Sequence, residues 1–417
     1  MRKPFSKFFI GSFILFFLPA PFLYGQQAGH EPLETSATLS FTEIYTQALN
    51  NAPETLERDI RQQQADSYEA IADNWITQRP SLVMSYLDDN LLGNIGQREF
   101  DYAIQLQLRR PSERNSSRLL SNSYQEQTSA WDLALQHYIA GRVRNILADI
   151  TEAEARLALE QEATRNTEEL LNITTTLFNA GELPRLDVMQ VETLLLNQRQ
   201  LVMETEAMLI DAERNYEVLT GIRVRPDYLY TESLTELDDI DASHPQLVIL
   251  QSEINLAEAN VLMSEASARG APILSLGTSH QRADVFQPSN DSIALSLSIP
   301  FGAPNIVASQ TSAARRRKVD AEVLYQNTFR QLDLTLHEVE HDLFLATEAI
   351  VLAEEKSELS EQRWEMSRTA FSQGEITMAQ VIQALQEFME AQKQSQLLLL
   401  RKERLITEFN QTIGVMP

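Results

Sequence analysis

The sequence predicts a mainly α-helical chain: a tandem repeat of long coiled-coil helical hairpins, with one β-hairpin per repeat that contributes to a membrane β-barrel. Three observations lead to this prediction. One phrase recurs 193 residues later, an apolar heptad runs through both copies, and short segments of alternating polarity precede each heptad. With only 13 Gly and 15 Pro among 417 residues, the chain has few points at which a helix must end.

The repeat is visible without gaps over much of the chain. The segment "LFNAGELPRLDVMQ" is echoed by "AFSQGEITMAQVIQ", which aligns Phe178 with Phe371 and Gly181 with Gly374, and the same offset aligns Gly221 with Gly414. A one-residue slip aligns Pro53 with Pro245. We therefore predict a first repeat over 26–221, a linker over 222–244 between the repeats at mid-length, and a second repeat over 245–417.

Each repeat is predicted to begin with a helix and to hold one long helix, a tip and a return helix. Apolar residues follow a 4–3 heptad spacing from Ile139 to Leu157 and, in the same register, from Leu332 to Ile350. A helix over 112–178 would be about 100 Å long. The tip glycines stop the long helices, and a proline suits the next first turn. The predicted long helices, tips and return helices are 112–178, 179–184 and 184–220, and then 304–371, 372–377 and onward to 413.

Two β-hairpins, over 81–109 and 273–300, precede the long helices. Their clearest strands alternate apolar and polar residues, as membrane strands of about 9–11 residues do. The residues expected to face the membrane are Tyr102, Ile104, Leu106, Leu108, Ile293, Leu295, Leu297 and Ile299. Four strands cannot close a barrel with a lumen, and eight make a narrow one. Association of three or more copies is therefore favoured.

The remaining composition limits location and partners. Residues 1–25 place three basic residues before an apolar run, which is typical of a cleaved export signal. The chain has no cysteine, which excludes disulfides, thiolate metal sites and a lipid anchor on cysteine. A net charge of −25 argues against nucleic acid as a partner. Basic residues after each hairpin, such as Arg109 and Arg110, suit either lipid headgroups or a solvated helix face.

The chain resembles the TolC-like outer membrane efflux family over nearly all of its mature length. The resemblance is carried, in order, by "NNAPETL", "QLRRPSERN", "AGELPRLDVMQ", "SHPQL", "LSIPFGAPN", "QGEITMAQVIQ" and the terminal "TIG". It implies a homotrimer with a twelve-stranded barrel in the outer membrane and an α-helical tunnel across the periplasm. It also implies a periplasmic adaptor (membrane fusion) protein, an inner-membrane pump of the RND type, contact with outer membrane lipid, and no cofactor.

The same resemblance implies roles for particular residues. The adaptor-contacting tips would be Gly181, Glu182, Leu183, Gly374, Glu375 and Ile376. Candidates for the periplasmic constriction are Asp187, Gln380 and Gln383. Because the second repeat has glutamines there, an acidic ring built from that repeat is in doubt. The compact size and the "Gly-Glu-Ile" tip are similar to the heavy-metal (cobalt-zinc-cadmium type) branch, which makes metal cations or drugs the expected cargo.

Three alternatives remain open. A type I protein-secretion duct would share the architecture. The stretch "HEVEH" fits a zinc protease in which His337 and His341 bind the metal and Glu338 acts as the base. However, Val339 belongs to the apolar seam, and the repeat-mate of this stretch has no histidine, so we predict no enzyme and no metal site. A soluble periplasmic coiled coil would lack the barrel.

Overall fold

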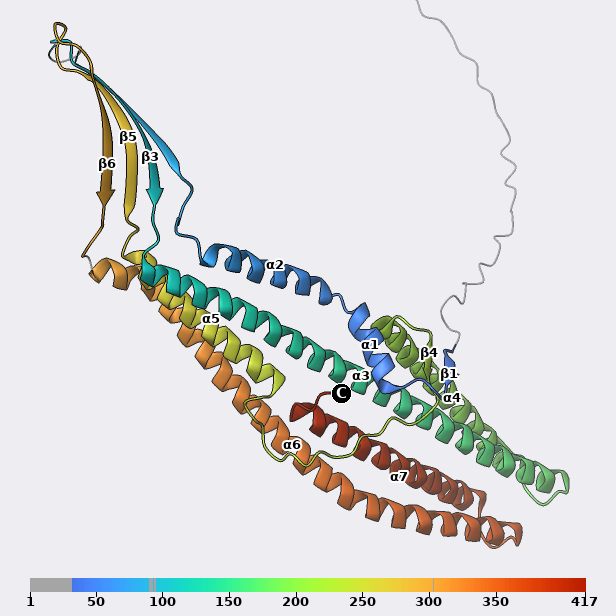
Figure 1. Ribbon diagram of the computed structural model, residues 1–417. Helices are drawn as coiled ribbons and strands as arrows, with labels where there is room; N and C mark the ends of the chain where they lie inside the picture. The colour runs from blue at the N-terminus through green and yellow to red at the C-terminus, as the bar shows by residue number, and fades with distance from the viewer. Residues whose placement is uncertain (1–31, 90–92, 94, 303) are drawn as a thin grey trace, which may run out of the picture.

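The computed structural model describes residues 32–89, 93, 95–302 and 304–417. These residues form an elongated molecule with a small β-sheet at one end and two helical hairpin tips at the other (Figure 1). The predicted signal over 1–25 lies outside the described residues. Among those described, no helix is both long and apolar enough to cross a membrane.

The elements come in the same order in both halves of the chain. Each half has one or two shorter helices, a β-hairpin, a 69-residue helix and a return helix, so the predicted repeat of long helical hairpins with one β-hairpin each is confirmed. The first half comprises α1 (Phe41–Asn51), α2 (Thr55–Ala72), β2 (Ser81–Asp88), β3 (Arg98–Gln107), α3 (Pro111–Asn179) and α4 (Arg185–Thr220). The second comprises α5 (Pro245–Ala268), β5 (Ile273–Arg282), β6 (Asn290–Ser298), α6 (Pro304–Ser372) and α7 (Met378–Thr412). Two short strands, β1 (Glu34–Ser36) and β4 (Val224–Pro226), pair in parallel beside α1.

The helices pack along the two longest ones. α4 covers the tip half of α3 and α5 covers its sheet half, while α5 also packs against α6 and so joins the two repeats (Figure 1). α7 returns beside α6 and also contacts α3. A 69-residue helix spans about 100 Å, which sets the length of the molecule.

The four long strands make one antiparallel sheet in the order β2-β3-β5-β6. The central pairing of β3 with β5 joins the two repeats, with Tyr102 opposite Thr278 and Ile104 opposite Leu276. β2 and β6 are the edges. The sheet that each repeat begins is thus completed by the other repeat.

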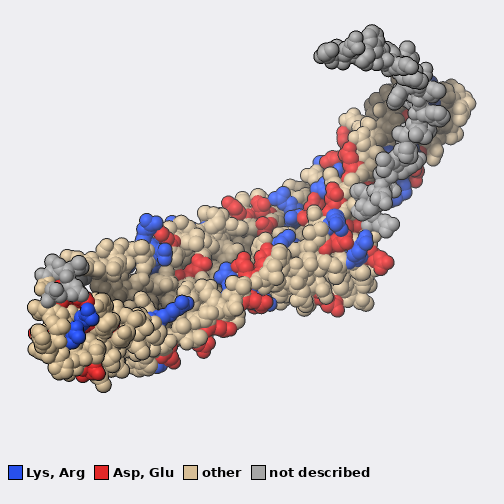
Figure 2. Space-filling view, turned by 90° about the horizontal axis from the view of Figure 1, so that it is seen from above, with Lys and Arg blue, Asp and Glu red and all other residues tan. Residues whose placement is uncertain are grey.

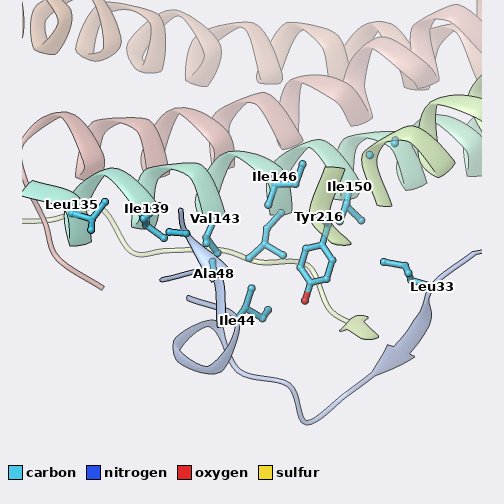
Figure 3. Close-up of a cluster of buried hydrophobic side chains, with 13 residues drawn as sticks. Leu33, Ile44, Ala48, Leu135, Ile139, Val143, Ile146, Ile150 and Tyr216 are labelled. Carbon is cyan, nitrogen blue, oxygen red and sulfur yellow. The ribbon is translucent and has the colours of Figure 1, made fainter. Parts of the chain in front are cut away.

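The heptad seam forms the core at mid-length. Ile139 and Val143 of α3 lie on the side of that helix that faces Ala48 and Ile44 of α1, and Tyr216 of α4 packs in the same cluster (Figure 3). Tyr216 is fully buried, and its hydroxyl donates to the Val224 carbonyl oxygen at 3.0 Å. In the second repeat the matching seam residues of α6 pack against the C-terminal part of α7 in a separate cluster. Burial of these seams orders both long helices.

Candidate functional site

Both hairpin tips are built by the same turn. The amide of Gly181 donates to the Phe178 carbonyl and that of Glu182 to Leu177, each at 2.9 Å. The equivalent bonds follow Gly374 in the second repeat, at 2.9 and 3.0 Å. These paired bonds define a Schellman motif, which requires a left-handed residue. Gly181 and Gly374 supply it with φ of 82° and 78°.

One apolar cluster supports both tips. Trp364 and Phe371 of α6 and Met378 and Phe388 of α7 pack with Leu170 of α3 in a single core. The predicted tip residues Leu183 and Ile376 pack half-buried against this cluster, whereas the four predicted glycine and glutamate positions are exposed. This shared cluster holds the two tips together at one end of the molecule.

The predicted constriction residues differ in their burial and in their hydrogen bonds. Asp187 lies half-buried in the first turn of α4, where a carboxylate suits the helix dipole. Gln380 holds the same position in α7 and accepts hydrogen bonds from the amide and hydroxyl of Thr377, at 2.9 and 3.0 Å, in a capping box. Gln383 is exposed and donates to Glu387 at 2.9 Å. Gln380 therefore has a structural role in the helix start.

A groove of about 560 Å³ lies between the two return helices close to the tips. Its walls include Leu186, Met189 and Thr193 of α4 and Ala379 and Ile382 of α7. Leu186 and Met189 are 63% and 51% exposed. Apolar side chains share the lining with polar ones, among them Gln190, Asn197 and Gln386, and a groove of this kind between two helices suits a helical partner.

Polar contacts tie α7 to α3 along the tip half. Lys393 pairs with the buried Glu160 at 2.6 Å, and Arg404 pairs with Asp149 at 2.8 Å. Acidic and basic side chains are intermingled along the helical body on the face seen in Figure 2. On this face the acidic side chains are spread along the body and lie among basic ones.

The sheet separates its residues by polarity. The register places Met84, Tyr102, Thr278 and Ile293 in one row of one face, and Ser85, Asp101, Ser279 and Ser292 in a row of the other face. The first face is mainly apolar, although its row next to the loops ends in His280 and Asp291, and the second is mainly polar, although it includes the row that begins at Val83. The six predicted apolar positions within the strands all fall on the first face: Tyr102, Ile104, Leu106, Ile293, Leu295 and Leu297. The exposed fractions of Ile293 and Leu295 reach 81% and 70%.

Two residues predicted to lie on these strands fall just outside them. β3 ends at Gln107, and Leu108 continues only as an isolated bridge to Ile76. β6 ends at Ser298, so Ile299 lies in the passage to α6. Pro300 follows directly, and its lack of an N–H group prevents the ladder from continuing.

The arginines after β3 have roles that the sequence analysis missed. Arg109 is 7% exposed and donates to the Ile71 carbonyl at 2.7 Å, at the end of α2. Arg110 donates to the carbonyls of Gly270 and Pro300 at 2.9 and 2.6 Å. Arg109 is therefore neither in contact with lipid headgroups nor on a solvated helix face, the two positions expected for it. Both side chains fasten backbone ends of neighbouring segments, and Arg110 joins the repeats where sheet meets helix.

The "HEVEH" stretch does not assemble a zinc site within the described part of the chain. His337, Glu338 and His341 are exposed on α6, while Val339 is buried in a core cluster. Among the described residues there is no group of three or more His, Cys, Asp or Glu side chains arranged to hold a metal ion. A zinc protease needs a third ligand, and the neighbouring elements do not bring one.

Comparison with known proteins gives matches by structure only. No family model matches the sequence, and no curated protein does. The chain aligns with CusC, described as forming a transmembrane channel, at 15% identity and a TM-score of 0.71, over 94% of this chain and 98% of that one. The outer membrane protein VceC from Vibrio cholerae aligns at 13% identity and 0.71, over 90% and 96%. The outer-membrane channel OprN aligns at 16% and 0.71, over 90% and 89%.

The chain has the TolC-like fold. The resemblance drawn from the sequence motifs is thereby confirmed at the level of the fold, and the match extends over nearly the whole of each neighbour. In this fold the sheet and the tips stand at opposite ends of the molecule, as they do in Figure 1.

Proposed function

We propose that this protein is the outer membrane channel of a tripartite efflux system, conducting substrates passively across the periplasm and the outer membrane. One observation carries the proposal: a sheet with one mainly apolar and one mainly polar face continues directly into helices about 100 Å long. The apolar face suits lipid and the polar face suits a water-filled lumen. The helices would extend the lumen through the periplasm.

Closing the sheet requires other copies of the chain. Unpaired edges in lipid leave backbone groups unsatisfied, so β2 of one copy would pair with β6 of the next. Three copies give a barrel of twelve strands, wide enough for a polar lumen. The trimer would be anchored by the mainly apolar outer face, for example by the row that contains Ile104, Leu276 and Leu295.

The tips would dock a periplasmic adaptor, which links the duct to an inner-membrane pump of the RND type. Two equivalent tips per chain would give six in a ring. Exposed Gly181, Glu182, Gly374 and Glu375 would meet the adaptor first, and the groove lined by Leu186 would accept an apolar side chain or helix from it. Energy would come from the pump, so the channel itself needs no cofactor and no catalytic group.

Gating would involve the tip end of the lumen. Asp187 provides the acidic candidate from the first repeat, and the exposed Gln383 is the polar candidate from the second. Because the repeat-mate of Asp187 is the neutral Gln380, a trimer would have three carboxylates at this position rather than six. The proposed cargo is metal cations or drugs. Export of a protein substrate instead would identify a type I secretion duct.

The test begins with the mature protein purified from outer membranes in detergent. Light scattering should give the mass of three chains, and planar bilayers should show a stable single-channel conductance. A monomer that conducts nothing would refute the duct. As a control, a deletion of residues 81–109, which removes the first hairpin, should abolish conductance, since an incomplete sheet cannot close.

A further inference from the structure

Two buried histidines meet where α3, α5 and α7 come together at mid-length. His137 of α3 and His244 at the start of α5 are 3% and 2% exposed, and their rings meet edge to face with centroids 5.2 Å apart. Neither residue has a part in the proposed transport. Their repeat-mates by position, Arg330 and Ala52, are not histidines, so the pair occurs at only one of the two equivalent junctions.

Each ring makes contacts that require an unprotonated Nδ1. His137 Nε2 lies 2.9 Å from the Gln411 backbone oxygen and must donate to it, which leaves Nδ1 to accept from the Gln411 side-chain amide at 3.3 Å. His244 Nδ1 accepts from the amide of Gln246 at 3.1 Å and so caps α5. A proton on either Nδ1 would place a donor against a donor. The Nε2 atom of His244 is buried and makes no well-formed hydrogen bond, and the nearby Thr412 carbonyl interacts with this ring only weakly.

Close packing keeps solvent away from the pair. A Cβ atom on Gly141 would lie 2.7 Å from the Gln411 side chain, and one on Gly414 would lie 2.7 Å from the His244 ring. The two glycines let α3 and the end of α7 approach the rings closely. A new charge formed here would be poorly hydrated.

The charges around the rings do not favour protonation either. Arg144 of α3 faces His137, and its own partners are Glu232 of the linker at 2.7 Å and Gln411 at 2.6 Å. Burial raises the pKa of Glu232, but hydrogen bonds from Arg144, Tyr230 and Asn410 outweigh it and lower that pKa, so this carboxylate is already engaged. The carboxylate of Asp241, beside His244, accepts from Ala242 and Ser243.

The remaining neighbours are uncharged. The first turn of α5 holds no acidic residue, and the α7 residues that face the junction, Asn410 to Thr412, carry no charge. No anion is therefore placed to receive a new imidazolium among the described residues that pack here.

We propose that His137 and His244 form an acid-sensitive fastening that holds the end of α7 and the start of α5 to the middle of α3, and that releases when the rings gain protons. Release would free the base of the second helical hairpin from the first. The inference concerns contacts within one chain, so it holds whether or not three copies form a duct.

Acid weakens the fastening because burial lowers the pKa of both rings. Burial, then the neighbouring His137, lowers the pKa of His244 from 6.5 to about 4, against a smaller opposite effect of the Thr412 carbonyl. Burial also lowers the pKa of His137. The fastening is therefore at full strength above pH 6.5 and weakens as the pH falls toward 4. For His244 alone, the ratio of open to closed junction should rise about 30-fold between pH 7.5 and pH 5.

The test measures one distance in the full-length mature protein. The chain has no cysteine, so spin labels can be attached through Asn145→Cys on α3 and Glu408→Cys on α7, both exposed positions. Dilution with unlabelled protein restricts pulsed-EPR distances to those within one chain. We expect a narrow distribution at pH 7.5 and a longer, broader component that grows as the pH falls to 5.

The matched control carries His137→Gln and His244→Asn. Glutamine keeps a donor and an acceptor, asparagine is a good helix cap, and neither titrates in this range. Its distribution should stay narrow at pH 5. The proposal is overturned if the wild-type distribution is the same at pH 7.5 and 5, or if the control broadens equally. If the double variant already differs at pH 7.5, His244→Asn alone is the control and the same criteria apply.

Discussion

Replacement of one tip glycine by valine should loosen that tip by a predictable amount. Gly181 has φ of 82°, and a Cβ atom added there meets nothing within 4 Å. The cost of Gly181→Val is therefore backbone strain without a steric clash, about 1–2 kcal/mol for a left-handed residue. If the turn relieves this strain by opening, its open population should rise about 5- to 30-fold.

The assay is hydrogen exchange of the Glu182 amide, which is protected by its bond to the Leu177 carbonyl. Its exchange, resolved by mass spectrometry with electron-transfer fragmentation, should accelerate about 5- to 30-fold in Gly181→Val. The matched control is Gly181→Asn, because asparagine tolerates the left-handed region, and it should change the rate about 2-fold at most. The unmodified turn at Gly374 provides an internal reference.

Equal protection of Glu182 in the valine variant and in wild type would refute the strain argument. Equal acceleration by valine and asparagine would show that any side chain disturbs the tip. If tip shape governs adaptor docking, replacing both glycines with valine should abolish export while membrane insertion stays intact. Export retained at wild-type level would then refute the tip assignment.

Three further predictions concern other parts of the chain. Arg110→Met should lower the free energy of unfolding in micelles by about 2–4 kcal/mol, because the hydrogen bonds to the Gly270 and Pro300 carbonyls are lost. Arg110→Lys should lower it less, and equal losses in the two variants would contradict a role for these hydrogen bonds. Lys393→Met, which leaves Glu160 buried without its charge partner, should destabilise by about 3 kcal/mol, and adding Glu160→Gln should restore part of that in urea titrations. Alanine at His337 and His341 should leave conductance and bound zinc unchanged, as measured by bilayer recording and metal analysis.

The long-range plan of the fold could be predicted because few residues interrupt it. Gly181 and Gly374 stop the long helices, Pro111 and Pro304 stand at their first turns, and the heptads between them fix the buried side. The alternation of β3 and β6 fixed which side chains share a face, because successive residues in a strand point in opposite directions.

Contacts between distant segments could not be predicted in the same way. The burial of Arg109 depends on where α2 ends, and the engagement of Gln380 depends on the exact start of α7. The first predicted helix is divided into α1 and α2 around Pro53, a break that the repeat alignment with Pro245 could have indicated. The fastening at His137 joins residues more than 100 positions apart, which no local spacing reveals.

The fastening also sits at a mechanically sensitive place. From its end near Gln411, α7 runs 35 residues to the tip, a lever arm of about 52 Å. A turn of about 6° at the pivot would carry the far end through about 5 Å, the width of a side chain, given that length. A small rotation of α7 at the two imidazole rings therefore becomes a large displacement of its tip. The packing of these rings would thus determine how accurately the tips meet another protein, although the rings lie half the molecule away.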